Sequence, residues 1–132
     1  MSEKKKHEPE YTLHVFHTKD PETNVAATAV AVLSVREFVS FRYEIPLESS
    51  LDGRTMSVII HGLRVPENLV PGKGHAQGII KYPTLQGEYE LIITNVDGEV
   101  NRFSLSISSR TIGVKKLSKK SFIVYSSETI KR

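Results

Sequence analysis

The chain has 132 residues, of which 39% are hydrophobic and 8% aromatic, and it contains no cysteine and no tryptophan. This length and composition are typical of one globular domain with an aliphatic core, and the lack of cysteine excludes disulfides and cysteine-ligated zinc. The net charge is +3, but it is unevenly divided: residues 1–101 contain 10 Lys and Arg against 14 Asp and Glu, whereas residues 102–132 contain 8 basic residues and one acidic residue.

Residues 1–10 are charged and no apolar run follows them, so we expect a disordered segment and not a signal peptide. The longest apolar stretch, Val25–Val35, is too short to span a bilayer. These features predict a cytoplasmic protein without membrane contact, in which residues 11–126 form a single β domain and residues 127–132 fray.

Two segments follow the charged N-terminus. Tyr11–His17 alternates apolar and polar residues with period two, which predicts a strand with one buried face. Asn24–Val35 is ambiguous, because its alanines and the preceding Asp20-Pro21 pair favour a helix, whereas its four valines and the absence of a polar stripe favour a buried strand. We favour the strand, since a helix that is apolar all round needs cover on every side.

The next two segments are predicted to form a hairpin. Phe38–Ile45 and Thr55–Val65 both alternate, and Asp52-Gly53 between them is a turn signal. A two-residue turn there pairs Ile45 with Ile60, which keeps the apolar residues of both strands on one face.

Residues 66–78 contain two prolines and three glycines and are predicted to form a long loop. Gly78–Tyr82 follows as a short strand.

Gly87–Ser108 carries the clearest pattern in the chain, with two alternating strands joined at Asn95-Val96-Asp97-Gly98. A two-residue turn would put Leu91 opposite Ser104 and split the apolar faces across the sheet. We therefore predict a three-residue turn that pairs Leu91 with Phe103, with Gly98 in the left-handed conformation as a bulge.

Thr111–Leu117 and Phe122–Tyr125 are predicted as the last two strands. Strands separated by turns, without alternating helices, indicate a mainly β fold. We predict an antiparallel β-sandwich of immunoglobulin-like architecture with seven to eight strands. An α+β fold with a helix near residues 21–35 and an open barrel are the alternatives.

The glycine-rich loop has three polar groups that could bind a ligand: Lys73, His75 and Gln77. A phosphate-binding P-loop requires Lys followed by Ser or Thr and then a helix, but here Gly74 and a predicted strand follow Lys73. The glycines fit a turn function better, and small-molecule binding at residues 66–78 is a secondary hypothesis.

The sequence carries no metal or catalytic motif. His14 and His17 are three residues apart on a predicted strand and point to opposite faces. There is no H-E-x-x-H spacing and no G-x-S-x-G motif, so we predict neither a cofactor nor an enzyme.

The basic C-terminal segment is the most specific functional cue. Five basic residues fall within eleven positions: Arg110, Lys115, Lys116, Lys119 and Lys120. Such a cluster can bind the phosphates of nucleic acid or another polyanion, but no aromatic residues are interleaved with it. Lysines on an edge strand also prevent strands of other chains from pairing with it.

The leading hypothesis from the sequence is a non-enzymatic interaction module. Its partner would be another protein or a second copy in a homodimer, bound through an exposed sheet edge, the 66–78 loop, or both. Polyanion or nucleic-acid binding through the basic segment is the alternative.

Overall fold

The computed structural model describes residues 9–19, 21–39, 43–65, 74–83, 85–118 and 121–126. These residues form strands and connecting turns, with no helix among them and hence none that could span a membrane. The strands are β1 (Tyr11–Lys19), β2 (Ala26–Phe38), β3 (Leu47–Asp52), β4 (Thr55–Ile60), β5 (Gly74–Pro83), β6 (Gly87–Thr94), β7 (Val100–Ile107), β8 (Ile112–Lys116) and β9 (Ile123–Tyr125).

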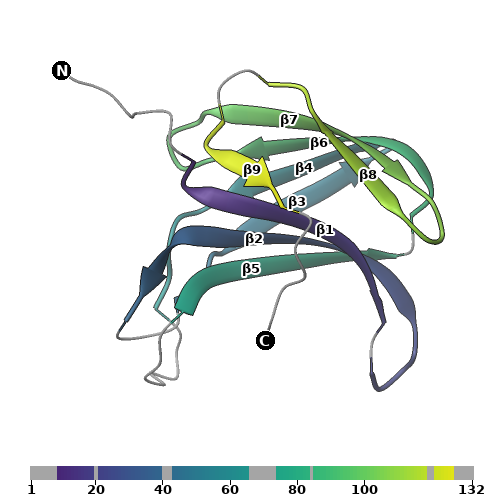
Figure 1. Ribbon diagram of the computed structural model, residues 1–132, viewed down its shortest axis with the longest axis horizontal. Helices are drawn as coiled ribbons and strands as arrows, with labels where there is room; N and C mark the ends of the chain where they lie inside the picture. The colour runs from purple at the N-terminus through teal and green to yellow at the C-terminus, as the bar shows by residue number, and fades with distance from the viewer. Residues whose placement is uncertain are drawn as a thin grey trace.

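The strands make two sheets (Figure 1), one in the order β5-β2-β1-β9 and the other in the order β3-β4-β6-β7-β8. The prediction of purely antiparallel pairing is wrong, because β1 pairs with β9 in parallel and β4 pairs with β6 in parallel. Parallel neighbours require a crossover connection. After β4 the chain forms β5 in the four-stranded sheet and then returns to the five-stranded sheet as β6. After β8 it leaves the five-stranded sheet, and β9 joins β1 in the other one.

One hydrophobic cluster includes side chains from both sheets. Its fully buried members follow the period of two expected for strands with one core-facing side. They include Leu13, Val30 and Val32 of the four-stranded sheet, and Met56, Val58, Leu91, Ile93, Phe103 and Leu105 of the five-stranded sheet.

The ambiguous apolar segment is strand β2, and the helix alternative is wrong. β2 lies between β5 and β1, and residues on both of its faces are fully buried, among them Ala29 and Val30. Ala29 pairs with Phe16 on one side and Lys81 on the other, so larger neighbours flank its methyl group. Burial on both faces explains why the segment has no polar stripe.

The central hairpin has the predicted register. Leu91 pairs with Phe103, and Gly98 has a φ of 84°. The Asn95 side chain shapes the turn from within, because its Oδ1 accepts hydrogen bonds from the N–H groups of Asp97 and Glu99 at 3.0 and 2.8 Å. This prediction is confirmed.

The first hairpin differs from its prediction. Leu47, not Ile45, pairs with Ile60, and the two-residue turn is Gly53-Arg54 because Asp52 pairs with Thr55. Gly53 has a φ of 61° at the first turn position, as in a type II′ turn. The observed partner of Ile60 is two residues later in the chain than the predicted one. A shift by two residues leaves each side chain on the same face of the sheet, so the core-facing residues of β4 are as predicted.

The predicted strand Phe38–Ile45 is wrong in the described residues. Phe38 ends β2, residues 40–42 lie outside the described part, and Glu44 makes only isolated bridges to Arg64 and Gln77. Glu44 and Ile45 therefore belong to the connection between β2 of one sheet and β3 of the other.

Asn101 connects the two sheets within the core region. Its side chain is 4% exposed, and its Oδ1 accepts hydrogen bonds from the N–H groups of Phe122 and Ile123 at 3.0 and 3.4 Å. Asn101 belongs to β7, whereas Ile123 begins β9, so this amide positions the last strand against β1.

Candidate protein-binding edge

The three residues predicted to form a ligand site in the 66–78 loop do not form one in the described structure. Lys73 lies outside the described residues, whereas His75 and Gln77 belong to β5, which begins at Gly74 and not at Gly78. His75 Nδ1 donates a hydrogen bond to the Ser34 carbonyl at 2.7 Å, so this imidazole holds β5 against β2. The described part of the chain thus contains no three-residue polar cluster at this loop.

A bulge in β2 explains why β5 begins earlier than expected. The β2–β5 pairing shifts between Leu33 and Glu37. At this bulge the Ser34 hydroxyl takes the place of a main-chain hydrogen-bonding group. It accepts a hydrogen bond from the Ala76 N–H at 2.8 Å and donates one to the Arg36 carbonyl at 2.6 Å. This N–H of β5 therefore points toward β2.

The connection before β3 covers one point on the opposite edge of β5. Ile45 donates its N–H to the Gln77 carbonyl at 3.0 Å. At Gly78 a Cβ atom would collide with the Ile45 carbonyl oxygen and touch Leu47, so only glycine fits beneath this crossing. The Gln77 carbonyl therefore points away from β2.

Beyond this crossing, no residue in the described part of the chain pairs with the edge of β5. In an antiparallel strand, residues alternate between bonding one neighbour and the other. Since the Gln77 carbonyl faces outward, Ile79 and Lys81 also direct their N–H and C=O groups outward, while Ile80 and Tyr82 bond β2. No described residue bonds these outward groups of Ile79 and Lys81. Figure 1 shows β5 along the lower edge of the front sheet, with β2 on its other side.

The other three sheet edges are shorter or more strongly charged. β9 has three residues, β3 carries the exposed acids Glu48 and Asp52, and β8 ends in the exposed pair Lys115 and Lys116. Charges of this kind oppose the addition of another strand. The open part of β5, Gly78–Tyr82, contains a single charged residue. It is therefore the edge least protected against strand addition.

The side of β3 that faces the core is also uncovered near this edge. Ser49 and Leu51 pair with Val58 and Met56 on the same face of the sheet. Val58 and Met56 are 0% exposed, yet Leu51 is 40% exposed and Ser49 is exposed as well. Leu47 at the start of β3 still packs against the core, whereas the later part of β3, from Ser49 to Leu51, is left uncovered.

Tyr82 contributes an unusual polar group at this margin. Its side chain faces the core and is 7% exposed, and its hydroxyl is buried without a hydrogen-bond partner. Burial raises the pKa of Tyr82 above its usual value, and the nearby Ser49 hydroxyl opposes this shift only in part. A buried hydroxyl without a well-formed hydrogen bond costs free energy, so this group destabilises the fold slightly.

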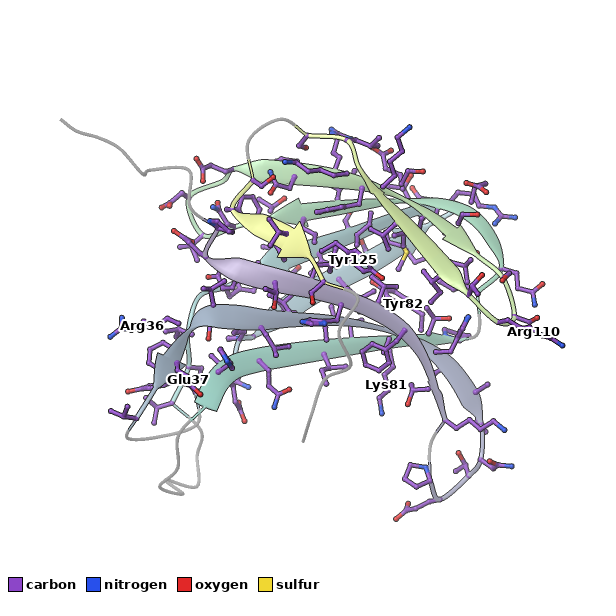
Figure 2. The ribbon with its side chains drawn as sticks, in the orientation of Figure 1. Arg36, Glu37, Lys81, Tyr82, Arg110 and Tyr125 are labelled. Carbon is purple, nitrogen blue, oxygen red and sulfur yellow. The ribbon has the colours of Figure 1, made fainter. Side chains whose placement is uncertain are left out.

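The predicted basic patch is distributed over β8 and its surroundings. Arg110 lies at the tip between β7 and β8 (Figure 2), whereas Lys115 and Lys116 lie at the other end of β8. Lys115 pairs with Ser104 and Lys116 with Phe103, so the two lysines point to opposite faces. Lys119 and Lys120 lie outside the described residues.

Among the described side chains, no three His, Asp or Glu residues lie close enough to hold a metal ion. The ordered histidines have structural partners: His17 Nε2 donates to the Ser108 carbonyl at 2.7 Å and His61 Nε2 lies 2.9 Å from Glu48 Oε1. Neither histidine adjoins a nucleophile in these contacts.

The sequence pointed to an exposed edge without identifying the strand. The sequence predicts strand pairs only within the two hairpins, and the alternation of Gly78–Tyr82 does not indicate its neighbours. The open edge could therefore not be located from the sequence.

No protein-family model, no curated protein and no solved structure matches this chain. Its function is therefore inferred from its own residues.

Proposed function

We propose that this protein is a non-enzymatic interaction module that binds an extended segment of a protein partner along the open edge of β5. The observation that carries this proposal is the pair of outward-facing residues, Ile79 and Lys81, whose backbone N–H and C=O groups have no partner among the described residues. An added strand would satisfy all four groups. Main-chain hydrogen bonds supply affinity in this mode of recognition, and side-chain pockets supply specificity.

The surrounding structure supports a binding function for this edge. β5 is supported by β2 along ten residues, so the edge is rigid before a partner arrives, which lowers the entropic cost of binding. The Ile45 crossing at Gln77 limits the available edge at one end, and Pro83, which has no N–H group, limits it at the other. The open edge therefore accepts a short segment.

The two sheets around one core support a β-sandwich of immunoglobulin-like architecture in the broad sense. Many unrelated functions occur on this architecture, so it does not select among them.

A proline at position 79 tests the proposal. Ile79→Pro removes the outward N–H group, while Ile79→Ala retains it and shortens the side chain to a similar extent. With each protein immobilised, we expect mass spectrometry to identify a partner from native extract that is captured by the wild type and Ile79→Ala but lost with Ile79→Pro. A partner that Ile79→Pro retains in full would show that binding occurs elsewhere.

Size exclusion at micromolar concentration separates the two kinds of partner. Binding to a second copy would appear as a dimer of the isolated protein that Ile79→Pro dissociates. Binding to a different protein leaves the isolated chain monomeric.

A further inference from the structure

We infer that the β5 edge selects a segment in which an acidic residue is flanked by two apolar residues, from a protein other than a second copy of this chain. This inference rests on the proposed function and adds the chemistry of the partner. It follows from what lies on each face of a strand added beside Ile80, Lys81 and Tyr82.

The register of the added strand determines where its side chains point. Residues directly opposite each other in a sheet project to the same face. A bound residue opposite Lys81 therefore lies on the outer face, and bound residues opposite Ile80 and Tyr82 lie on the core-facing side. Of three consecutive partner residues, the middle one therefore contacts the outer face of the sheet, and its two neighbours contact the core-facing side.

On the core-facing side, the bound strand would lie beside Ile80 and toward the uncovered part of β3. Ile80 is partly buried, and Leu51 on the core-facing side of β3 is 40% exposed. Apolar side chains from the partner would bury this leucine and continue the core by one strand. A polar residue would be desolvated against Leu51 without a matching group, apart from the hydroxyls of Ser49 and Tyr82.

On the outer face, Lys81 is the only charged side chain of the open edge. It is exposed, and no described carboxylate forms a salt bridge with it. In Figure 2 Lys81 lies on β5, whereas the labelled Arg110 lies at the tip between β7 and β8. A directly opposite carboxylate is favourable at this position and a directly opposite ammonium group is unfavourable.

A second copy of the chain satisfies neither requirement. In antiparallel pairing of β5 with itself, the outward-facing residues must meet each other, so Lys81 would face Ile79 or another Lys81. The first arrangement gives the ammonium group no anion, and the second brings two like charges together. Each copy would also bring its own β3 toward the same uncovered margin.

Three acetylated, fluorescein-labelled heptapeptides with identical Thr and Ser flanks test the inference. Their central residues are Val-Glu-Val, Val-Lys-Val and Ser-Glu-Ser. A cross-strand charge pair of either sign changes affinity by a factor of about 1.5 to 5, so exchanging Glu for Lys changes it about fivefold in total. We expect the wild type to bind Val-Glu-Val about fivefold more tightly than Val-Lys-Val by fluorescence anisotropy, and Ser-Glu-Ser about tenfold more weakly because two apolar contacts are lost.

Two variants of the protein test whether Lys81 contacts the central residue of the peptide and whether Leu51 contacts its two valines. Lys81→Glu is expected to reverse the preference, so that Val-Lys-Val becomes the tighter ligand. Leu51→Ser is expected to weaken Val-Glu-Val several-fold, whereas Leu117→Ser, which alters another exposed leucine beside β8, leaves it unchanged. Both leucines are surface-accessible, so neither substitution removes a core side chain.

The failures of the two proposals are distinguishable. Equal affinity for all three peptides, with binding still abolished by Ile79→Pro, overturns the selectivity and leaves strand addition standing. Absence of peptide binding up to millimolar concentration, or binding that Ile79→Pro does not affect, overturns both. A dimer of the isolated protein that Ile79→Pro dissociates also overturns the inference, because the partner would then be a second copy.

Discussion

Proline substitutions at two adjacent positions of β5 should have very different effects on stability. Ile79 directs its N–H away from β2, so Ile79→Pro removes no ladder hydrogen bond. Its cost is the loss of part of a half-buried side chain, about 1 kcal/mol. Ile80 bonds Val30 of β2, and Val30 is 0% exposed.

Ile80→Pro should therefore be much more destabilising. It leaves the buried Val30 carbonyl without its donor, at about 1–3 kcal/mol, and removes part of a side chain packed against the core, at about 1–2 kcal/mol. The expected total is about 2–5 kcal/mol, which for a domain of this size places the Tm of Ile80→Pro about 10 °C below that of Ile79→Pro.

Urea denaturation followed by circular dichroism measures both free energies of unfolding, and an unchanged slope with urea would show that the unfolded states are comparable. Equal destabilisation by the two prolines would refute the assignment of alternate residues to the two sides of β5. A larger loss at position 79 would mean that the outward side is already bonded.

Three further substitutions test the packing around the edge and the core. Gly78→Ala should lower the free energy of unfolding in urea by about 2 kcal/mol or more, because the new Cβ meets the Ile45 carbonyl. Gly113→Ala makes only an ordinary contact and should change it by no more than about 0.5 kcal/mol. Similar losses in the two variants would argue against the close crossing at Gly78. Asn101→Ala leaves two backbone N–H groups near the start of β9 without an acceptor and should cost about 2–4 kcal/mol by the same assay. Asn101→Asp keeps the acceptor, but it buries a charge and sets an oxygen against the Val100 carbonyl, to which the Asn101 Nδ2 now donates, so it should also destabilise. Tyr82→Phe should stabilise the protein by about 1 kcal/mol at pH 7, because it removes a buried hydroxyl that has no hydrogen-bond partner among the described residues. Burial raises the pKa of Tyr82 in the folded state, so the wild type should lose stability as the pH rises above 10, and the phenylalanine variant should lose less.

Local alternation was sufficient to predict the faces of most strands. The central hairpin is the clearest case, because only one parity keeps Leu91 and Phe103 on the same face, and a one-residue change in register would expose both. β2 was predicted as a strand on different grounds, namely its valines and the absence of a polar stripe, and it is buried on both faces as that pattern indicates.

Local alternation does not report which strands become neighbours. β9 was predicted as a strand, but its parallel pairing with β1 joins residues more than 100 positions apart, and the buried amide of Asn101, 21 positions before Phe122, also positions it. The extension of β5 to Gly74 depends on the Ser34 hydroxyl in a bulge of β2, which no pattern within residues 66–78 indicates. The open edge follows from these pairings and could not be located without them.

The most direct test of the open edge is amide hydrogen exchange measured residue by residue along β5 in the isolated protein by NMR. The N–H groups of Ile80 and Tyr82 bond β2 and should exchange slowly, whereas those of Ile79 and Lys81 should exchange at least a hundredfold faster. Slow exchange at all four positions would contradict the account, because it would mean that this edge is already covered and cannot accept the strand of a partner.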